Sequence, residues 1–371
     1  MYQPIYLDYN ATTPVKPDVR NAMTEALAMP SNASSIHRFG QEARRKIEQA
    51  RGEVATLIGA KPGEILFTSG ATEANNATMR NLGVERILIS AIEHPSIREA
   101  AEAETIPVDR SGRVDLDALA RMLADNRRRT LVSIMLVNNE TGVIQPIAEA
   151  AKIVRARGAL MHSDAAQAPG RIAIDVNALG VDLLTLAGHK MGGPQGIGAL
   201  YIRDGLDIVP LQRGGGQESR RRAGTENVAS IVGFGVAARL AADSLRDAPR
   251  LAALRDTMEA RLASLCNTLA IYGADAPRVC NTACFGAAGL SAETLLIALD
   301  LAGIAISSGA ACSSGAVQPS RILRAMGVEE NAAREAIRVS LGWGTVPEDI
   351  DRLVESWGMV YRRTRSAASA A

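Results

Sequence analysis

The chain contains little cysteine. Only four cysteines, Cys266, Cys280, Cys284 and Cys312, occur among 371 residues. Their number is small and their spacing irregular, which excludes a disulfide framework and is typical of reduced thiols. This pattern predicts a cytoplasmic location.

The chain also lacks an excess of one charge and a long apolar run. It carries 41 basic and 40 acidic residues, so no overall field attracts it to nucleic acid or to a membrane surface. No apolar run approaches the roughly 20 residues that a bilayer span needs. The N-terminus, "MYQPIYLDYNATTP", has no basic region followed by an apolar stretch, so it does not read as a signal peptide. We therefore expect neither a nucleic-acid nor a membrane partner.

Short apolar runs alternate with helical patterns through the first two thirds of the chain. The runs are "EILFT" (64–68), "RILIS" (86–90), "TLVSIMLV" (130–137), "ALMHS" (159–163) and "DLLTLA" (182–187). Stretches such as "PIAEAAKIVRARG" lie between them and end in glycine, as helices do. Apolar strands that alternate with helices predict an α/β fold with a mostly parallel sheet flanked by helices.

The pattern changes beyond about residue 245. A long amphipathic helix is expected over 245–265, followed by the strand-like pieces "VCNTACFGA" and "AIRVSLG". We interpret this part as a second, smaller α+β domain. The expected division is a large domain over 16–245 and a small domain formed by 1–15 and 246–371.

Polar and reactive residues follow each predicted strand. The segments are Ser69–Glu73, Ala91–His94, Asn138–Gly142, Asp164–Gln167 and Gly188–Lys190. The carboxyl ends of parallel strands form the edge at which ligands bind in open sheets. This placement predicts one composite active site.

Each of these residues is a weak signal when taken singly. A lone lysine such as Lys190 is usually a surface residue. A lysine that forms a Schiff base together with an aspartate for the pyridine nitrogen, here Asp164, is what pyridoxal-phosphate chemistry requires of a protein. Thr72 follows a Ser-Gly-Ala turn at a helix start, which suits a phosphate. His94 fits either a buried structural histidine or a group that moves protons on the cofactor ring.

Cys312 lies in "SSGAACSSG", a stretch of small residues from Ser307 to Gly315. Buried structural cysteines usually pack as small hydrophobes, but nothing in this stretch is large enough to bury a thiol. Glycine and serine give a segment conformational freedom. The pattern indicates a thiol on a flexible loop, about 307–318.

Taken together, the motifs resemble those of a known family. "YLDYNATTP", "SGATEANN", "EHPS", "NNETG", "DAAQ", "GHK", "GGGQESRRRAGTEN", "SSGAACSSG" and "RVSLG" occur in the order found in cysteine desulfurases of the nitrogen-fixation and iron–sulfur-assembly type. These enzymes belong to the class V aminotransferases, with the pyridoxal-phosphate fold of type I. The resemblance runs from about Leu7 to Asp351 and implies a seven-stranded sheet.

The resemblance also implies roles for particular residues. The implied cofactor-binding residues are Lys190 as the covalent anchor, Asp164 at the pyridine nitrogen, Gln167 at the phenolic oxygen, His94 on the ring, and Ala71, Thr72 and His189 at the phosphate. Thr225 resembles a phosphate ligand donated by the partner subunit, which implies a homodimer. Asn139 and Arg338 would hold the substrate carboxylate, a task that suits the arginine fork.

The implied reaction converts L-cysteine to L-alanine. Lys190 removes the α-proton, His94 relays protons, and the Cys312 thiolate attacks the sulfur and keeps it as a persulfide. The sulfur would pass to an acceptor or scaffold protein for iron–sulfur clusters or another sulfur-containing cofactor. The Gly/Ser-rich loop places the chain with the longer-loop members of the family.

The chain departs from the family pattern in several places. Relatives commonly have serine where this chain has Ala187, so one phosphate hydrogen bond is expected to be missing. They often have lysine in place of Gln195, serine in place of Ala310, and a further arginine where Trp343 stands. The chain also ends soon after its last predicted helix, whereas relatives with a longer tail use it to dock the scaffold.

Other interpretations remain open. One is another class V enzyme, an aminotransferase or a selenocysteine lyase, in which Cys312 is not essential. Another is a cofactor-free sulfur carrier or redox sensor. We expect no metal site: the alternation in "VCNTACF" puts Cys280 and Cys284 on one face of a strand, where core packing is the simpler interpretation. Packing is also expected for Cys266 and His162.

Overall fold

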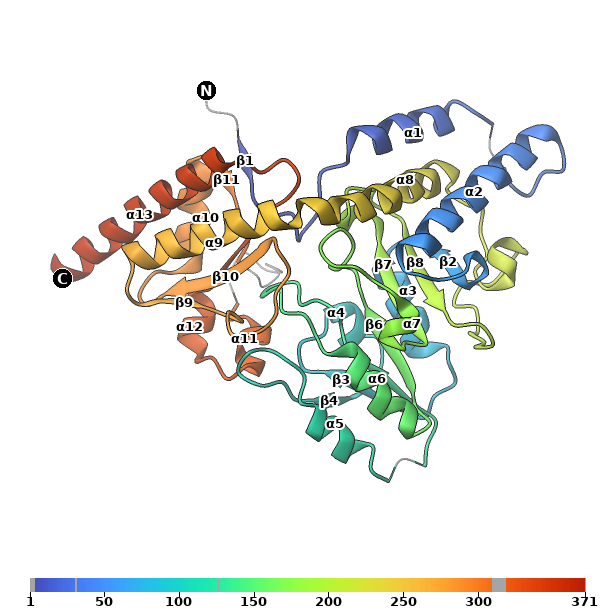
Figure 1. Cartoon of the computed structure of the whole chain (residues 1–371), viewed down its shortest axis with the longest axis horizontal. Coiled ribbons are helices and arrows are strands. Elements are labelled where there is room, and N and C mark those ends of the chain that lie inside the picture. Colours follow the sequence, from blue (N-terminus) through green and yellow to red (C-terminus); the bar gives the residue numbers. More distant parts are fainter. Residues whose placement is uncertain (1–3, 31, 126, 309–317, 371) are drawn as a thin grey trace.

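The structure, a computed structural model, describes residues 4–370 except residues 31, 126 and 309–317. A seven-stranded sheet of order β2-β8-β7-β6-β5-β3-β4 forms its centre (Figure 1). The strands are β2 (Ile65–Thr68), β3 (Arg86–Ser90), β4 (Glu104–Ile106), β5 (Thr130–Ser133), β6 (Leu160–Asp164), β7 (Leu183–Ala187) and β8 (Gly198–Ile202). Only β8 is antiparallel to its neighbours, which confirms the mostly parallel sheet.

Helices and further strands complete the described part of the chain. The α-helices are α1 (Pro17–Leu27), α2 (Arg38–Leu57), α3 (Ala71–Arg80), α4 (Pro95–Arg98), α5 (Leu116–Met122), α6 (Ile147–Ala156), α7 (Val176–Leu179), α8 (Val228–Ser244), α9 (Ala248–Leu265), α10 (Ala292–Leu301), α11 (Arg321–Ala325), α12 (Glu330–Glu335) and α13 (Pro347–Ala370). Short 3₁₀ turns are η1 (Pro62–Glu64), η2 (Gly188–Lys190), η3 (Gln217–Arg220) and η4 (Leu245–Asp247).

Both faces of the sheet are buried. Ile65 and Phe67 pack into the larger apolar cluster, which includes α2, α6 and α8, whereas Leu66 packs into the cluster formed with α3. Side chains of a strand alternate between faces, so an apolar residue at every position buries both faces. The continuous apolar runs of the sequence therefore reflect a sheet between two helical layers.

All five strands expected from the sequence are present. The run at 130–137 is the one whose strand is shorter than expected, because β5 ends at Ser133. Beyond this point Leu136 still donates its backbone N–H to Asp164 at 2.8 Å, but β3 ends at Ser90 and supplies no partner on the other side. The chain therefore leaves the sheet and turns toward the Asn138–Gly142 segment.

β8 brings two distant turns together because it lies between β2 and β7. Gly198 of β8 makes this approach possible: a Cβ atom on it would lie 2.7 Å from the carbonyl carbon of Gly70. Any side chain would therefore collide with the backbone of the turn after β2. The turn at Ser69–Thr72 and the turn at Gly188–Lys190 consequently meet at one edge of the sheet.

A second group of elements surrounds a separate apolar cluster. The antiparallel sheet β12 (Ile337–Ser340), β10 (Thr282–Ala287) and β9 (Leu269–Ile271) packs with α9, α10 and α13. The N-terminal β1 (Ile5–Tyr6) pairs in parallel with β11 (Ile304–Ala305), and its neighbour Leu7 joins this cluster. The domain boundaries at 15/16 and 245/246 stay a prediction.

The cysteine positions correct one expectation. Cys280 packs with the cluster of β10 residues Ala283 and Phe285, whereas Cys284 packs with Ile92 and Met135 in another cluster. The two thiols therefore do not share one face of a strand. The reason is that β10 begins at Thr282, so strand alternation does not extend back to Cys280. Both are buried, as expected.

Packing of Cys266 and His162 is confirmed. Cys266 directly follows α9 and is 1% exposed. His162 is fully buried in β6, with Nδ1 2.9 Å from Ser133 Oγ and Nε2 3.0 Å from Thr185 Oγ1. Two hydroxyl partners satisfy the neutral ring, and burial lowers its pKa to about 4.

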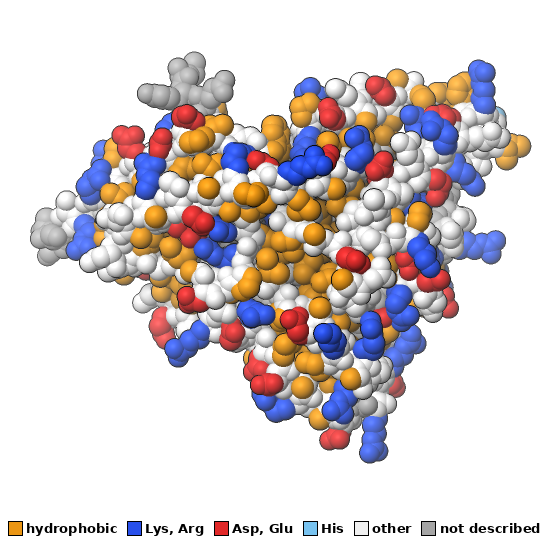
Figure 2. Space-filling view, in the orientation of Figure 1, with side chains coloured by type: hydrophobic (Ala, Val, Ile, Leu, Met, Phe, Trp, Pro, Cys, Tyr) orange, Lys and Arg blue, Asp and Glu red, His pale blue; other side chains and the backbone are white. Residues whose placement is uncertain are grey.

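The surface shows no field of one sign on the face drawn in Figure 2, where acidic and basic side chains are interspersed. Among the described residues, one helical stretch, Val228–Leu265, is long and apolar enough to span a membrane. More than half of its apolar window is buried inside the fold. Gly235 of this stretch packs directly on Ala50 of α2, where a Cβ would lie 2.6 Å from the Ala50 Cα. The stretch is accordingly a core element.

Candidate active site

A cavity of about 740 Å³ opens where the central strands end. The predicted site residues that line it are Ala71, Thr72, His94, Asn139, Asp164, Gln167, His189, Lys190 and Arg338. Thr225 is exposed and does not line it. Cys312 lies outside the described residues. The structure thus brings nine of the eleven predicted residues into one cavity.

Lys190 follows β7 in the short turn η2. Its Nζ donates to the backbone carbonyls of Asn10 and Ala11, the latter at 3.0 Å. Burial, followed by the nearby charges of Arg338 and Arg171, lowers its pKa to about 8. A lysine in this range is partly neutral near pH 7 and therefore nucleophilic.

Asp164 ends β6 and is 6% exposed. Its Oδ2 accepts from Asn75 Nδ2 at 2.8 Å, and its Oδ1 accepts from the backbone N–H of Ala166 at 2.9 Å. Asn75 also donates to Ser96 Oγ at 2.8 Å, and Ser96 in turn lies 2.7 Å from His94 Nδ1. A chain of hydrogen bonds therefore joins the carboxylate to the imidazole.

Asn75 and Ser96 were missed by the sequence reasoning. The available signal was their place inside the motifs "SGATEANN" and "EHPS", three residues after Thr72 and two after His94. His94 itself caps α4, accepting from the Ser96 N–H at 3.1 Å, and burial lowers its pKa. Because these contacts use Nδ1 of the neutral imidazole, its Nε2 is available to a ligand in the cavity.

The turn expected to bind a phosphate also lines the cavity. Ser69–Thr72 links β2 to α3, and the first N–H groups of this ten-residue helix have no partners within the helix. Together with the helix dipole they favour an anion. His189 is adjacent, with Nδ1 3.3 Å from Thr12 Oγ1, and burial beside Lys190 lowers its pKa to about 4.

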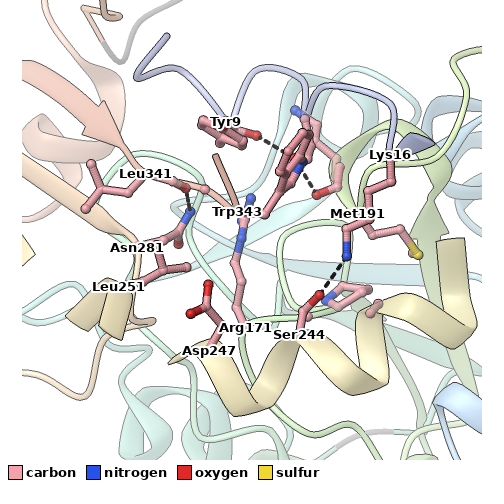
Figure 3. Close-up of a pocket in the computed structure, with 16 residues that line it drawn as sticks. Tyr9, Lys16, Arg171, Met191, Ser244, Asp247, Leu251, Asn281, Leu341 and Trp343 are labelled. Carbon is pink, nitrogen blue, oxygen red and sulfur yellow. Dashed lines mark hydrogen bonds between the residues drawn. The ribbon is translucent and has the colours of Figure 1, made fainter. Parts of the chain in front are cut away.

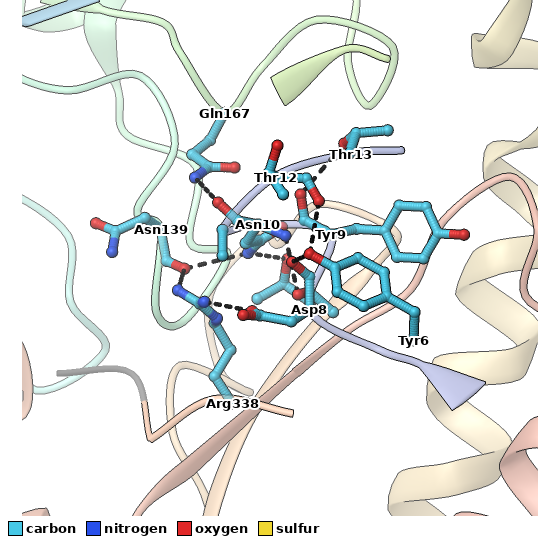
Figure 4. Close-up of polar contacts among 12 residues, drawn as sticks. Tyr6, Asp8, Tyr9, Asn10, Thr12, Thr13, Asn139, Gln167 and Arg338 are labelled. Atoms are coloured by element: carbon cyan, nitrogen blue, oxygen red, sulfur yellow. Dashed lines mark hydrogen bonds and ion pairs between the residues drawn. The ribbon is translucent and has the colours of Figure 1, made fainter. Parts of the chain in front are cut away.

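The N-terminal segment forms a wall of the cavity that the sequence reasoning missed. Asn10 is 1% exposed, and its side-chain amide donates to the Asn139 carbonyl at 3.1 Å and to Thr282 Oγ1 at 2.9 Å (Figure 4). Its own carbonyl accepts from Gln167 Nε2 at 3.0 Å and from Lys190. Asn10 therefore joins the central sheet to the smaller one at the site.

Arg338 lies in β12, and its side chain already forms an ion pair with Asp8. Its Nη2 donates to Asp8 Oδ1 at 2.6 Å and its Nη1 donates to the backbone carbonyl of Asn139 at 3.0 Å (Figure 4). Its Nε is buried without a hydrogen-bond partner. Asn139 thus contacts Arg338 through its backbone, while its side chain lines the cavity.

Arg171 fixes Gln167 from behind. Its Nη1 donates to the Gln167 carbonyl at 2.9 Å and to the Gln167 side-chain Oε1. Arg171 also lines a second cavity of about 70 Å³, together with residues that include Lys16 and Trp343 (Figure 3). Lys190 lines both cavities. Burial lowers the pKa of Arg171 to about 10. The arginine orients the amide and adds positive charge near Lys190.

Residues on both flanks of the predicted 307–318 loop make defined contacts, and one flank lies at the cavity. Ser307 lines the cavity, and the backbones of Ser307 and Arg338 exchange hydrogen bonds of 3.1 and 2.7 Å. On the other flank Ser320 Oγ donates to Glu140 Oε2, and Arg321 Nη2 donates to the Glu93 carbonyl at 3.1 Å. The departures Ala187 and Gln195 also line the cavity.

Comparison with known proteins gives the same family throughout. A sequence model of the family "Aminotransferase class-V" matches residues 5–353. The cysteine desulfurase IscS of Dictyoglomus turgidum is 40% identical over 99% of this chain and 96% of its own. The IscS-like cysteine desulfurase of Mycobacterium tuberculosis is 39% identical over 99% of this chain and 98% of its own. A cysteine desulfurase of Rhodobacter capsulatus is 44% identical over 95% of this chain and 96% of its own.

Solved structures agree with the sequence relatives. The NifS-like protein from Rickettsia africae has a TM-score of 0.91 and 37% identity, covering 97% of this chain and all of that one. The chain belongs to the class V aminotransferase family. Within that family its relatives are cysteine desulfurases, so the resemblance and the fold class expected from the sequence are confirmed.

Membership of this family implies pyridoxal phosphate as the cofactor, and the residues present fit it. The cavity combines a lysine of lowered pKa, a buried carboxylate at the end of β6 and an anion-binding turn at the start of a helix. These are the groups that the aldehyde, the ring nitrogen and the phosphate each require.

Proposed function

We propose that the chain is a pyridoxal-phosphate-dependent cysteine desulfurase that releases L-alanine from L-cysteine and keeps the sulfur as a persulfide on Cys312. One observation supports this most directly. A single cavity joins Lys190, Asp164 and His94 to Arg338, and it is also lined by Ser307, where the loop predicted to carry Cys312 begins. The relatives named cysteine desulfurase cover nearly the whole chain.

The cofactor would be held by eight residues. When bound, pyridoxal phosphate accepts the electron pair left at the substrate Cα. Lys190 Nζ would be the covalent anchor, and Asp164 would bind the ring nitrogen, Gln167 the phenolic oxygen and His94 the ring. The phosphate would be held by Ala71, Thr72, His189 and, from the partner subunit, Thr225. Asn75 keeps Asp164 in place through its hydrogen bond to Oδ2.

The remaining residues act on the substrate. Arg338 and Asn139 bind the α-carboxylate of cysteine, with the guanidinium offering parallel hydrogen bonds. Lys190 Nζ removes the proton at Cα, and His94 Nε2 moves protons at the amino and sulfur atoms. The Cys312 thiolate attacks the substrate sulfur, and the C–S bond breaks as the S–S bond forms. The electron pair of the C–S bond stays with Cβ, which takes up a proton and becomes the methyl group of alanine.

We also propose a homodimer. Thr225 is exposed and does not line the cavity of its own chain, which suits a residue that contacts the cofactor of a second copy. Leu27, Ile36 and Phe39 at the α1–α2 connection are 72%, 91% and 44% exposed, and large apolar side chains exposed this way favour burial against a partner. The sulfur acceptor is proposed to be another protein, reached by the 307–318 loop, and the cytoplasm remains the proposed location.

The test is alanine release from L-cysteine by the purified holoenzyme. We expect wild type to form alanine and Cys312→Ala to lose more than about 99% of that rate, because no thiol receives the sulfur. Cys266→Ala, which removes a buried thiol after α9, is the control and should retain most of the activity. Equal alanine release by wild type and Cys312→Ala would instead favour another class V enzyme, such as a selenocysteine lyase, in which Cys312 is not essential.

A further inference from the structure

The segment 216–226 has an unusual backbone. Glu218, Ser219 and Arg220 have φ values of 46°, 56° and 66°, so three consecutive residues with side chains adopt the left-handed conformation. A residue with a side chain is strained in this conformation. The segment keeps this shape because other parts of the chain bind it.

The first of these contacts is a buried ion pair. The Glu218 carboxylate accepts from Arg51 Nη2 at 2.6 Å and from Arg51 Nη1 at 2.8 Å, and the two side chains are 4% and 10% exposed. The same carboxylate accepts from the backbone N–H of Phe67 at 2.9 Å. Phe67 lies in β2, the strand that leads into the Ser69–Thr72 turn. The start of the segment is thus fixed to that strand.

The second contact reaches the turn itself. Arg222 donates through Nε to Glu73 Oε1 at 3.0 Å and through Nη2 to Glu73 Oε2 at 3.4 Å. Glu73 also accepts from the backbone N–H of Ser69 at 2.6 Å. Burial favours a raised pKa for Glu73, but the hydrogen bonds from Arg222 and Ser69 outweigh it and lower the pKa. A charged Glu73 therefore joins the turn to the segment.

Thr225 follows Arg222 by three residues, is exposed, and does not line the cavity of its own chain. We propose that Glu73 and Arg222 are positioning residues. In each subunit they couple the Ser69–Thr72 turn to Thr225, which contacts the cofactor phosphate in the partner subunit. The two sites of the dimer therefore take up pyridoxal phosphate cooperatively. This inference rests on the proposed function and its homodimer.

The coupling follows from the order of contacts. An anion bound by the Ser69–Thr72 turn restricts the turn, and Glu73, which bonds to Ser69, is restricted with it. Glu73 then holds Arg222, and Arg222 limits the motion of the Gly224–Thr225 backbone. At the second site Thr225 of the first subunit is already ordered, so binding of pyridoxal phosphate there costs less conformational entropy. The two-fold relation of the subunits makes the effect reciprocal.

The first experiment is a titration of the cofactor-free protein with pyridoxal phosphate, followed by the visible absorbance of the bound cofactor. We expect a Hill coefficient of about 1.5 for wild type and about 1 for Glu73→Gln and for Arg222→Lys. The control is Glu104→Gln, which breaks the Arg86–Glu104 pair at the far edge of the sheet and should keep the wild-type coefficient. A coefficient of 1 for wild type, or an unchanged one for Glu73→Gln, would overturn the inference.

Mixed dimers separate coupling from a local effect. One subunit carries Lys190→Ala, so only the wild-type partner gives the absorbance signal. Adding Glu73→Gln to the Lys190→Ala subunit leaves the reporting turn intact and alters only the chain that offers Thr225. We expect about three-fold weaker binding at the reporting site. Equal affinity would overturn the coupling while leaving the proposed function intact, whereas wild-type protein that takes up no pyridoxal phosphate would overturn both.

Discussion

Arg338 and Asp8 form an ion pair of 2.6 Å inside the cavity wall, although 330 residues separate them. The arginine proposed to bind the substrate carboxylate is thus partly neutralised. We expect Asp8→Asn to lower KM for L-cysteine about two- to five-fold, because the amide keeps an acceptor for Nη2 but removes the competing charge.

The measurement is the dependence of alanine release on cysteine concentration. Asp18→Asn, an exposed change on α1, is the control and should leave KM unchanged. An increase in KM for Asp8→Asn would show that the aspartate orients Arg338 rather than competing for it.

The pKa of Lys190 predicts how pH affects cofactor uptake. The free amine attacks the aldehyde only when neutral, so the rate at which the cofactor-free protein takes up pyridoxal phosphate should rise with pH around a midpoint near 8. An exposed lysine would give a midpoint near ~10.4. Stopped-flow absorbance at several pH values measures it.

Two variants should move this midpoint in opposite directions. Arg171 lowers the pKa of Lys190 by charge repulsion and Asp8 raises it. Arg171→Met is therefore expected to shift the midpoint to higher pH, and Asp8→Asn to lower pH. Shifts of the same sign would contradict the electrostatic assignment.

Ala187 is the place where a hydroxyl common among relatives is missing. It is fully buried and lines the cavity beside the phosphate turn. We expect Ala187→Ser to bind pyridoxal phosphate about five-fold more tightly, because one net hydrogen bond contributes about 1 kcal/mol. Equilibrium titration checks this, with Ala166→Ser, another cavity-lining alanine, as the control. An unchanged affinity for Ala187→Ser would mean that the hydroxyl does not reach the phosphate.

His162 predicts how stability depends on pH. Its folded-state pKa is about 4, below the ~6.5 of an unfolded chain. The unfolded state thus binds a proton that the folded state rejects, so stability is lost as pH falls from about 6.5 toward 4. Urea unfolding of His162→Gln between pH 7 and 5 should show a slope flatter by up to ~1.4 kcal/mol per pH unit.

The parts of the site that the sequence predicted are those fixed by local patterns. Lys190 and Asp164 directly follow apolar runs, and a parallel sheet places such residues at one edge. Asn10 and Asp8 escaped prediction because their partners lie 129 to 330 residues away, a pairing that local periodicity does not encode. Arg171 escaped because its task is to orient Gln167, which its residue type alone does not reveal.

Strand direction and face were harder to predict for the same reason. The antiparallel β8 differs from its neighbours only in its pairing, which tertiary contacts decide. Cys280 and Cys284 pack in different clusters because β10 begins two residues after Cys280. Strand boundaries of this kind are weakly marked in a sequence.

The pairing of β1 with β11 has a consequence for synthesis of the chain. Ile5 is made long before its strand partner Ile304. β1 therefore has no strand partner until β11 has been made, although Asn10 can already contact Asn139, Gln167 and Lys190. A chain that stops before Ile304 would have its central sheet but would lack β11 and Arg338, so its cavity would be incomplete.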